Sequence, residues 1–107
     1  MQLARFLNNT FKNDGFLLID ADLKKYIIGS PKKKIPITLK ILNKKFHYKL
    51  LLRPDLYFGE GYSDGDIIIE NGTLTDFLDL ALMNIGRRNI NFFSQFINKM
   101  SGSYRYL

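Results

Sequence analysis

The first thirty residues carry a helical pattern followed by two short apolar runs. Over residues 2–13 the apolar positions recur at intervals of three and four, which predicts an amphipathic helix that seals the core through Leu3, Phe6, Leu7 and Phe11. Residues 16–20 and 25–29 are rich in apolar and β-branched side chains and predict the two strands of a hairpin. The segment between them, Asp20 to Asp22, predicts a turn.

A third strand and a second helix are predicted in the next block. After a loop at residues 30–34, the alternation over residues 35–41 predicts a strand with one apolar face, formed by Ile37, Leu39 and Ile41. Pro36 should lie at the start or the edge of this strand, because proline cannot donate a ladder hydrogen bond. A helix that ends at Pro54 should follow, and its inward residues are Phe46, Leu50 and Leu51.

Residues 54–66 contain three glycines, three aromatic residues and four carboxylates. Glycines at this density favour a backbone that turns tightly or lies close to another element, since glycine accepts positive φ and has no Cβ. We therefore expect a structural turn whose main residues are Gly59, Glu60, Tyr62, Asp64 and Gly65. The β-branched run at residues 67–70 then predicts a buried strand.

Two helices are expected in the last third of the chain. The apolar residues from Leu74 to Ile85 follow the helical spacing, with Thr73 or Thr75 as the N-cap and Gly86 at the end. A further helix over residues 87–100 has a phenylalanine-rich stripe beside two arginines. Core packing, docking on a neighbouring domain and insertion into a lipid interface are all consistent with this stripe.

These elements predict a single α+β domain over residues 1–107. We expect a sheet of four or five short strands, mostly antiparallel, with the helices on one face. The hydrophobic content of 46% is sufficient for a core in a chain of this length.

The net charge of +6 is segregated along the sequence. Residues 24–53 contain ten Lys or Arg and no acid, and residues 54–86 contain seven Asp or Glu and no Lys or Arg. A basic face attracts polyanions such as nucleic acid or an anionic bilayer. The alternative is a solvated lysine face that only keeps the domain soluble. We expect a membrane surface formed by Lys32, Lys33, Lys34, Lys44, Lys45, Lys49 and Arg53. Nucleic acid is disfavoured, because the aromatic residues Tyr57, Phe58 and Tyr62 lie in the acidic half, apart from the basic residues that a stacking platform would require.

The residue types that carry catalysis or bind metal are sparse. The chain has no cysteine, and Asp20 with Asp22 makes only a fragment of a calcium loop, so an ordinary turn is favoured there. His47 is the one histidine and has no acid-base partner near it in the sequence, which favours a surface or capping role. We expect no catalytic residue and no metal site. No apolar run approaches the roughly 18 residues of a membrane span, and the first residues lack the charged region and continuous apolar core of a signal peptide, so a soluble or peripheral protein is expected. The lack of cysteine fits a reducing cytoplasm, and the expected location is cytoplasmic and peripheral to the inner membrane.

The sequence from about residue 15 to residue 85 resembles the amino-terminal region of cyclopropane-fatty-acyl-phospholipid synthases, which include the mycolic acid cyclopropane synthases. The matching residues are the run from Leu50 to Leu56, then Gly59-Glu60, Tyr62 and Asp64-Gly65, and finally the run from Leu74 to Leu78. Gly61 stands where the family usually has alanine, and Ser63 stands where a larger residue is common. The element order is more distantly similar to the lipid-binding domain of sterol carrier proteins.

The resemblance implies a non-catalytic module of an S-adenosylmethionine-dependent methyltransferase that acts on unsaturated phospholipid acyl chains. The doubly wound domain that binds S-adenosylmethionine would follow this region, so no cofactor is expected within these residues. The implied role is lipid or membrane engagement, or docking onto the C-terminal methyltransferase domain. A freestanding carrier that encloses an acyl chain is the alternative. The expected partners are an anionic phospholipid membrane or an acyl chain and the methyltransferase domain; a homodimer stays open and nucleic acid is not expected.

Overall fold

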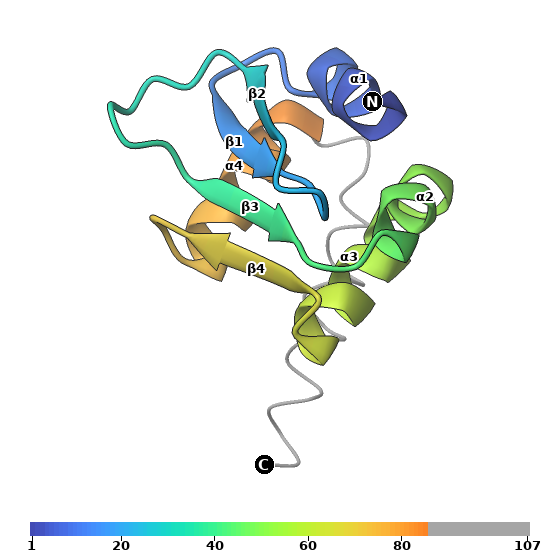
Figure 1. The fold of residues 1–107 in the computed structure, drawn as a ribbon. Helices are drawn as coiled ribbons and strands as arrows, with labels where there is room; N and C mark the ends of the chain where they lie inside the picture. The colour runs from blue at the N-terminus through green and yellow to red at the C-terminus, as the bar shows by residue number, and fades with distance from the viewer. Residues whose placement is uncertain (86–107) are drawn as a thin grey trace.

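Four helices and four strands form the described part of the chain, residues 1–85 of a computed structural model (Figure 1). Their order is α1 (Gln2–Thr10), β1 (Gly15–Ile19), β2 (Lys25–Gly29), β3 (Thr38–Ile41), α2 (Lys45–Leu52), α3 (Pro54–Asp64), β4 (Ile67–Glu70) and α4 (Leu74–Ile85). The predicted helix over residues 87–100 lies outside the described residues.

The four strands form one mixed sheet in the order β2-β1-β3-β4. β1 pairs antiparallel with β2 but parallel with β3, and β3 pairs antiparallel with β4. The α+β class is therefore confirmed, but the prediction of a mostly antiparallel sheet is wrong. The reason is the connection after β2, residues 30–37, which returns the chain to the far side of β1 and starts β3 at the same end as β1.

One face of the sheet forms the core. Alternate strand residues are buried on that face, and they include Phe16, Leu18, Ile28, Leu39, Ile41 and Ile67. In Figure 1 the strands lie in front of α4, while α1, α2 and α3 lie towards the right, and no described helix crosses in front of the sheet. This arrangement agrees with the predicted grouping of the helices. The predicted burial of Ile37, Leu39 and Ile41 is also confirmed.

The glycine-rich segment forms the helix α3, so the predicted turn over residues 54–66 is wrong for most of its length. Pro54 occupies the first turn, where the missing N–H is harmless, and Gly65 ends the helix with φ 80°. Gly59 and Gly61 lie inside the helix and are buried. A Cβ on Gly61 would lie 2.5 Å from Cδ1 of Ile67. Because glycines occupy inward positions that apolar residues usually fill, the periodic pattern of a helix was missing.

The ends of the other helices have local causes. α1 ends at Thr10, earlier than predicted, and Phe11 continues in an extended conformation into the core. A capping box starts α4, since the Thr73 N–H donates to Asp76 Oδ2 at 2.9 Å and the Asp76 N–H donates to Thr73 Oγ1 at 3.1 Å. Thr73, one of the two predicted caps, therefore performs that role.

Candidate functional site

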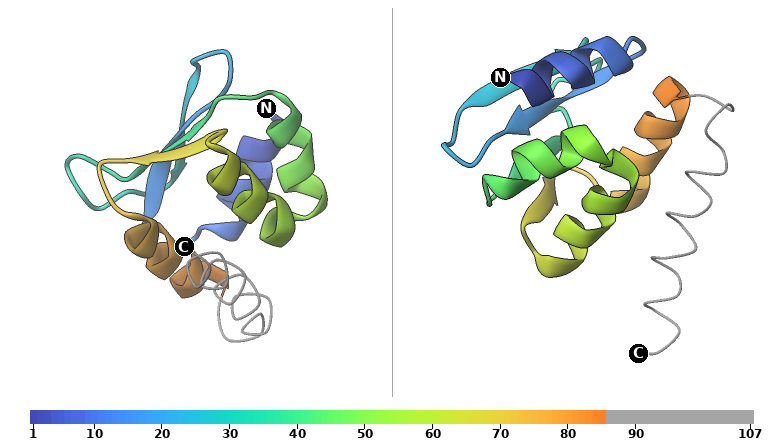
Figure 2. Two further views of the ribbon diagram at one scale, coloured as in Figure 1. Left: turned by 90° about the horizontal axis from the view of Figure 1, so that it is seen from below. Right: turned by 90° about the vertical axis from the view of Figure 1, so that its right-hand side faces the viewer.

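An apolar groove of about 500 Å³ lies between α1 and α4. Figure 2 (right) shows these two helices at the top and the right of the molecule, with α3 below them. The groove walls come from Leu3, Phe6 and Leu7 of α1 and from Phe77, Leu78, Ala81 and Ile85 of α4. Leu39, Leu50 and Phe58 complete the apolar lining. A volume of this size lies within the range of about 300–1,000 Å³ that small-molecule sites occupy.

Packed aromatic rings hold the inner wall of the groove. Phe77 makes an edge contact with Phe16 at 5.2 Å between ring centroids and stacks with Phe58 at 5.3 Å. Phe11 makes an edge contact with Phe16 at 5.0 Å. Such pairs are favourable beyond the area that they bury. These rings come from α3, α4, β1 and the end of α1, so their contacts connect four elements at the inner wall.

Asn84 connects the two sides of the groove. Its side chain accepts the N–H of Asn13 and donates to the carbonyl of Asn13, both at 2.7 Å. Asn13 lies just after α1, so this pair of hydrogen bonds ties the end of α1 to the last turn of α4. The rings of Phe11 and Phe77, with centroids 6.4 Å apart, make a second contact between these two sides.

The groove has little acid-base chemistry. Asp55 is the one carboxylic acid among its described lining residues. Arg53 donates to it from Nε and Nη2 at 3.2 and 3.1 Å, which holds the pKa of Asp55 below its ordinary value. A carboxylate held in its ionised form is a poor proton donor. The described lining is thus mainly apolar, with one ionised carboxylate.

The cationic residues expected at a membrane surface do not form one cluster. Lys32, Lys33 and Lys34 lie in the loop between β2 and β3, on the left in Figure 1, while the other four lie on or beside α2, on the right. Three of those four have acidic partners: Lys44 with Asp22 at 3.2 Å, Lys49 with Glu60 at 3.5 Å and Arg53 with Asp55 at 3.1 Å. Lys49 also lies 4.9 Å from the ring centroid of Tyr57. The positive charge near α2 is therefore partly neutralised.

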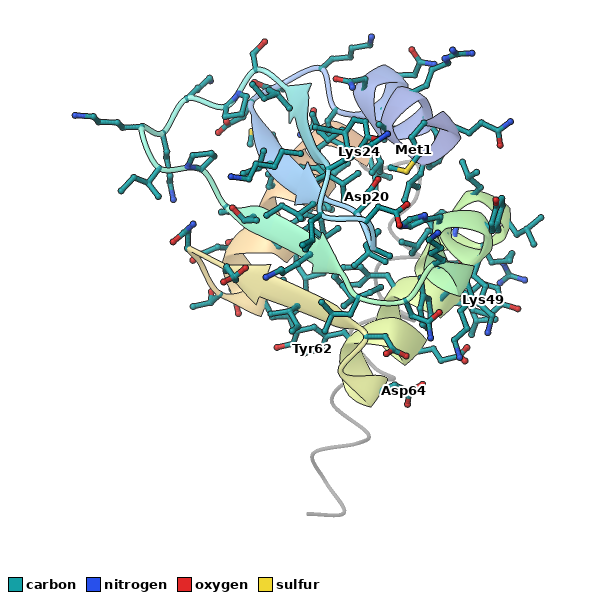
Figure 3. All side chains as sticks on the ribbon, viewed as in Figure 1. Met1, Asp20, Lys24, Lys49, Tyr62 and Asp64 are labelled. Carbon is teal, nitrogen blue, oxygen red and sulfur yellow. The ribbon has the colours of Figure 1, made fainter. Side chains whose placement is uncertain are left out.

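The polar residues of the glycine-rich segment do not converge on a site. Glu60 pairs with Lys49, and Tyr62 stacks with Phe58 at 6.3 Å between ring centroids. Asp64 is exposed at the end of α3. Figure 3 shows Lys49, Tyr62 and Asp64 pointing in different directions from α2 and α3. This placement is consistent with the architectural role that the sequence predicts for Glu60, Tyr62 and Asp64.

Asp20 organises the turn between β1 and β2. Its buried carboxylate accepts the N–H groups of Asp22 and Lys24, both at 2.9 Å, and the hydroxyl of Tyr26 at 3.3 Å. Burial and the Asp20 charge raise the pKa of Tyr26. His47 accepts the N–H of Ala21 through Nε2 at 3.2 Å, so it links α2 to this turn. The turn predicted at Asp20 is confirmed. His47, predicted as a surface or capping residue, is half-buried and caps no helix end that the structure describes; it accepts a hydrogen bond from the turn.

Residues 1–85 contain neither a helix that could span a membrane nor a group of side chains that could hold a metal ion. No helix there is long and apolar enough to cross a membrane. In the same residues, no three His, Cys, Asp or Glu side chains are grouped so that they could hold a metal ion.

The chain matches no protein-family model, and no curated protein matches it. The likeness to the synthases therefore stays a prediction from the sequence.

The groove is the feature that the sequence did not predict as a site. Its lining residues were predicted as core positions of separate helices, including Leu3, Phe6, Leu7 and Leu78. Phe6 is 36% exposed although it lies on the apolar stripe of α1. The partial exposure of Phe6 can be interpreted as a groove wall only when the helix opposite α1 is known, and the sequence does not identify that helix.

Proposed function

We propose that this chain is a non-catalytic lipid-binding module of the kind expected at the amino-terminal end of cyclopropane-fatty-acyl-phospholipid synthases. In this proposal the groove between α1 and α4 holds the hydrocarbon chain of a fatty acid or a phospholipid. The apolar groove of about 500 Å³ is the observation that carries the proposal. The S-adenosylmethionine site and the methylene transfer belong to the methyltransferase domain of the proposed enzyme.

The chemistry of the groove supports an acyl ligand. The walls are aliphatic and aromatic side chains. Transfer of an acyl chain from water to such a surface is favourable by roughly 0.8 kcal/mol for each buried methylene group. Few polar residues line the groove: Asn9, Thr10, Asp55 and Asn84. Asn9 and Thr10 lie at the end of α1, where their side chains could meet a lipid headgroup.

The test is the binding of a fluorescent fatty acid to the full chain, followed by displacement with an unlabelled phospholipid. Leu78 lines the groove, so Leu78→Trp should fill it and weaken probe binding by at least about tenfold, equivalent to roughly 1.4 kcal/mol. Met83 is exposed on α4 and does not line the groove, so Met83→Trp is the matched control and should bind as the unaltered chain does. Absence of probe binding, or an equal loss in both variants, would contradict the proposal.

A freestanding acyl-lipid carrier would use the same groove. The two functions differ in what the chain does alone. A carrier should accelerate the transfer of a labelled fatty acid between two vesicle populations. A module of a larger enzyme should bind the acyl chain without accelerating that transfer.

A further inference from the structure

The sheet face opposite the helices carries apolar side chains that no described element covers. By strand register this face holds two rows, one of Ile27, Leu17, Thr38 and Glu70 and the next of Lys25, Ile19, Lys40 and Ile68. Thr38 is buried and Leu17 and Ile19 are half-buried, so the uncovered apolar side chains are those of Ile27 and Ile68. Ile27 is 68% exposed and Ile68 is 38% exposed. An apolar patch bordered by charged residues is typical of an interaction surface. We call this surface the open sheet face.

The turn between β1 and β2 projects on the same side. Both panels of Figure 2 show it on the side of the sheet away from α4, and His47 of α2 and Lys44 beside α2 contact the turn. Leu23 in this turn is 70% exposed and has φ 67°, a conformation that bulky residues rarely adopt. The buried carboxylate of Asp20 holds the turn through the N–H groups of Asp22 and Lys24. A residue in such a conformation persists only where its surroundings impose it, and such residues gather at functional sites.

The charges around the open sheet face leave a positive surplus. Asp22 and Glu70, two carboxylates on this side, already pair with Lys44 at 3.2 Å and Lys40 at 3.8 Å. Lys24 and Lys25 follow Leu23 directly and form no ion pair within residues 1–85. Figure 3 labels Lys24 and Asp20 on this hairpin. A basic residue at an anionic lipid surface increases affinity by roughly fivefold.

The geometry points to the open sheet face as the surface through which this domain binds an anionic bilayer. Leu23 and Ile27 enter the headgroup region, and Lys24 and Lys25 contact anionic headgroups. This inference rests on the proposed lipid-binding function and assigns it a second surface, apart from the groove. The surface also differs from the lysine set expected from the sequence, because Lys44, Lys49 and Arg53 are paired with acids.

The experiment is flotation of the full chain with vesicles of phosphatidylcholine alone and of phosphatidylcholine with phosphatidylglycerol, at low and high salt. We expect binding to the anionic vesicles that decreases with salt, since exposed charges are screened. Leu23→Asn removes the apolar side chain but keeps a residue that tolerates positive φ, and it should weaken this binding by about tenfold. Leu52→Asn is the matched control, because Leu52 on α2 is 75% exposed and lies away from the hairpin, and it should leave binding unchanged.

Three results would overturn the inference: equal binding to both vesicle types, an equal loss in both leucine variants, or no loss in Leu23→Asn. A wild-type dimer in light scattering that Leu23→Asn converts to a monomer, without an effect on flotation, would instead assign the face to self-association and would also overturn it. The fatty-acid probe separates this inference from the groove proposal. Leu23→Asn should keep full probe affinity, so loss of flotation with intact probe binding concerns the sheet face alone.

Discussion

Gly61 of α3 lies directly against Ile67 of β4, and a Cβ on Gly61 would come within 2.5 Å of Cδ1 and 2.7 Å of Cγ1 of that isoleucine. Ile67 is 1% exposed and has little room to move. The contact lets α3 approach the sheet closely.

We predict that Gly61→Ala destabilises the fold by about 1 kcal/mol. Alanine gains about 1 kcal/mol of helix propensity over glycine, but overpacking in a core costs typically 1–3 kcal/mol. In an Ile67→Val background Cδ1 is gone and the γ carbon remains close, so the same substitution should cost less than in the unaltered chain. Urea unfolding of the four chains measures this coupling, and an identical cost in both backgrounds would show that Ile67 is not the cause.

Gly65 tests backbone conformation without any steric neighbour. It has φ 80°, and no atom lies within 4 Å of where its Cβ would be. We predict that Gly65→Ala costs about 1–2 kcal/mol, because the left-handed region is unfavourable for residues with a Cβ. Thermal and urea melts decide this. Gly65→Asn should cost less than Gly65→Ala, and the reverse order would contradict a backbone origin.

Asp76 should make stability depend on acid. The N–H and the hydroxyl of Thr73 hydrogen-bond its carboxylate and lower its pKa in the folded chain. A lowered folded pKa means that the stabilisation is present above the unfolded value of about 3.9 and is lost as the pH falls through the folded value. The stability difference between the unaltered chain and Asp76→Asn should therefore be largest near neutral pH and shrink below about pH 4. A stability difference that stays constant over the pH series would contradict the capping role. Asp79→Asn, at an exposed site on the same helix, is the control.

Asp20 should matter more for stability than its neighbour Asp22. Asp20→Ala leaves the N–H groups of Asp22 and Lys24 without their acceptor, which costs about 1–3 kcal/mol. The Asp22 side chain is 54% exposed in its pair with Lys44, and an exposed pair contributes about 0–1 kcal/mol. Chemical unfolding of Asp20→Ala and Asp22→Ala compares the two. Equal losses would mean that the turn is not held by the buried carboxylate.

The elements with a regular apolar period could be predicted from the sequence. The helical spacing from Leu74 to Ile85 predicted α4. The alternation of Ile37, Leu39 and Ile41 predicted the buried face of β3. Both patterns could be recognised because the inward positions carry apolar side chains. α3 was missed because Gly59 and Gly61 occupy its inward positions and carry no side chain to reveal the period. The parallel pairing of β1 and β3 depends on the path of residues 30–37, which local sequence does not determine. The groove was missed because its walls meet only after α1 and α4 pack together.

The most direct test of the central claim is nuclear magnetic resonance of the full chain with a fatty acid that carries a nitroxide spin label near its methyl end. The label broadens signals of nearby atoms, so it reports where the hydrocarbon lies. The account predicts selective broadening at groove residues such as Leu7, Leu78 and Ala81, with Ile27 and Ile68 of the open sheet face unaffected. Uniform broadening, or broadening centred on Ile27 and Ile68 with the groove unaffected, would contradict acyl-chain binding between α1 and α4.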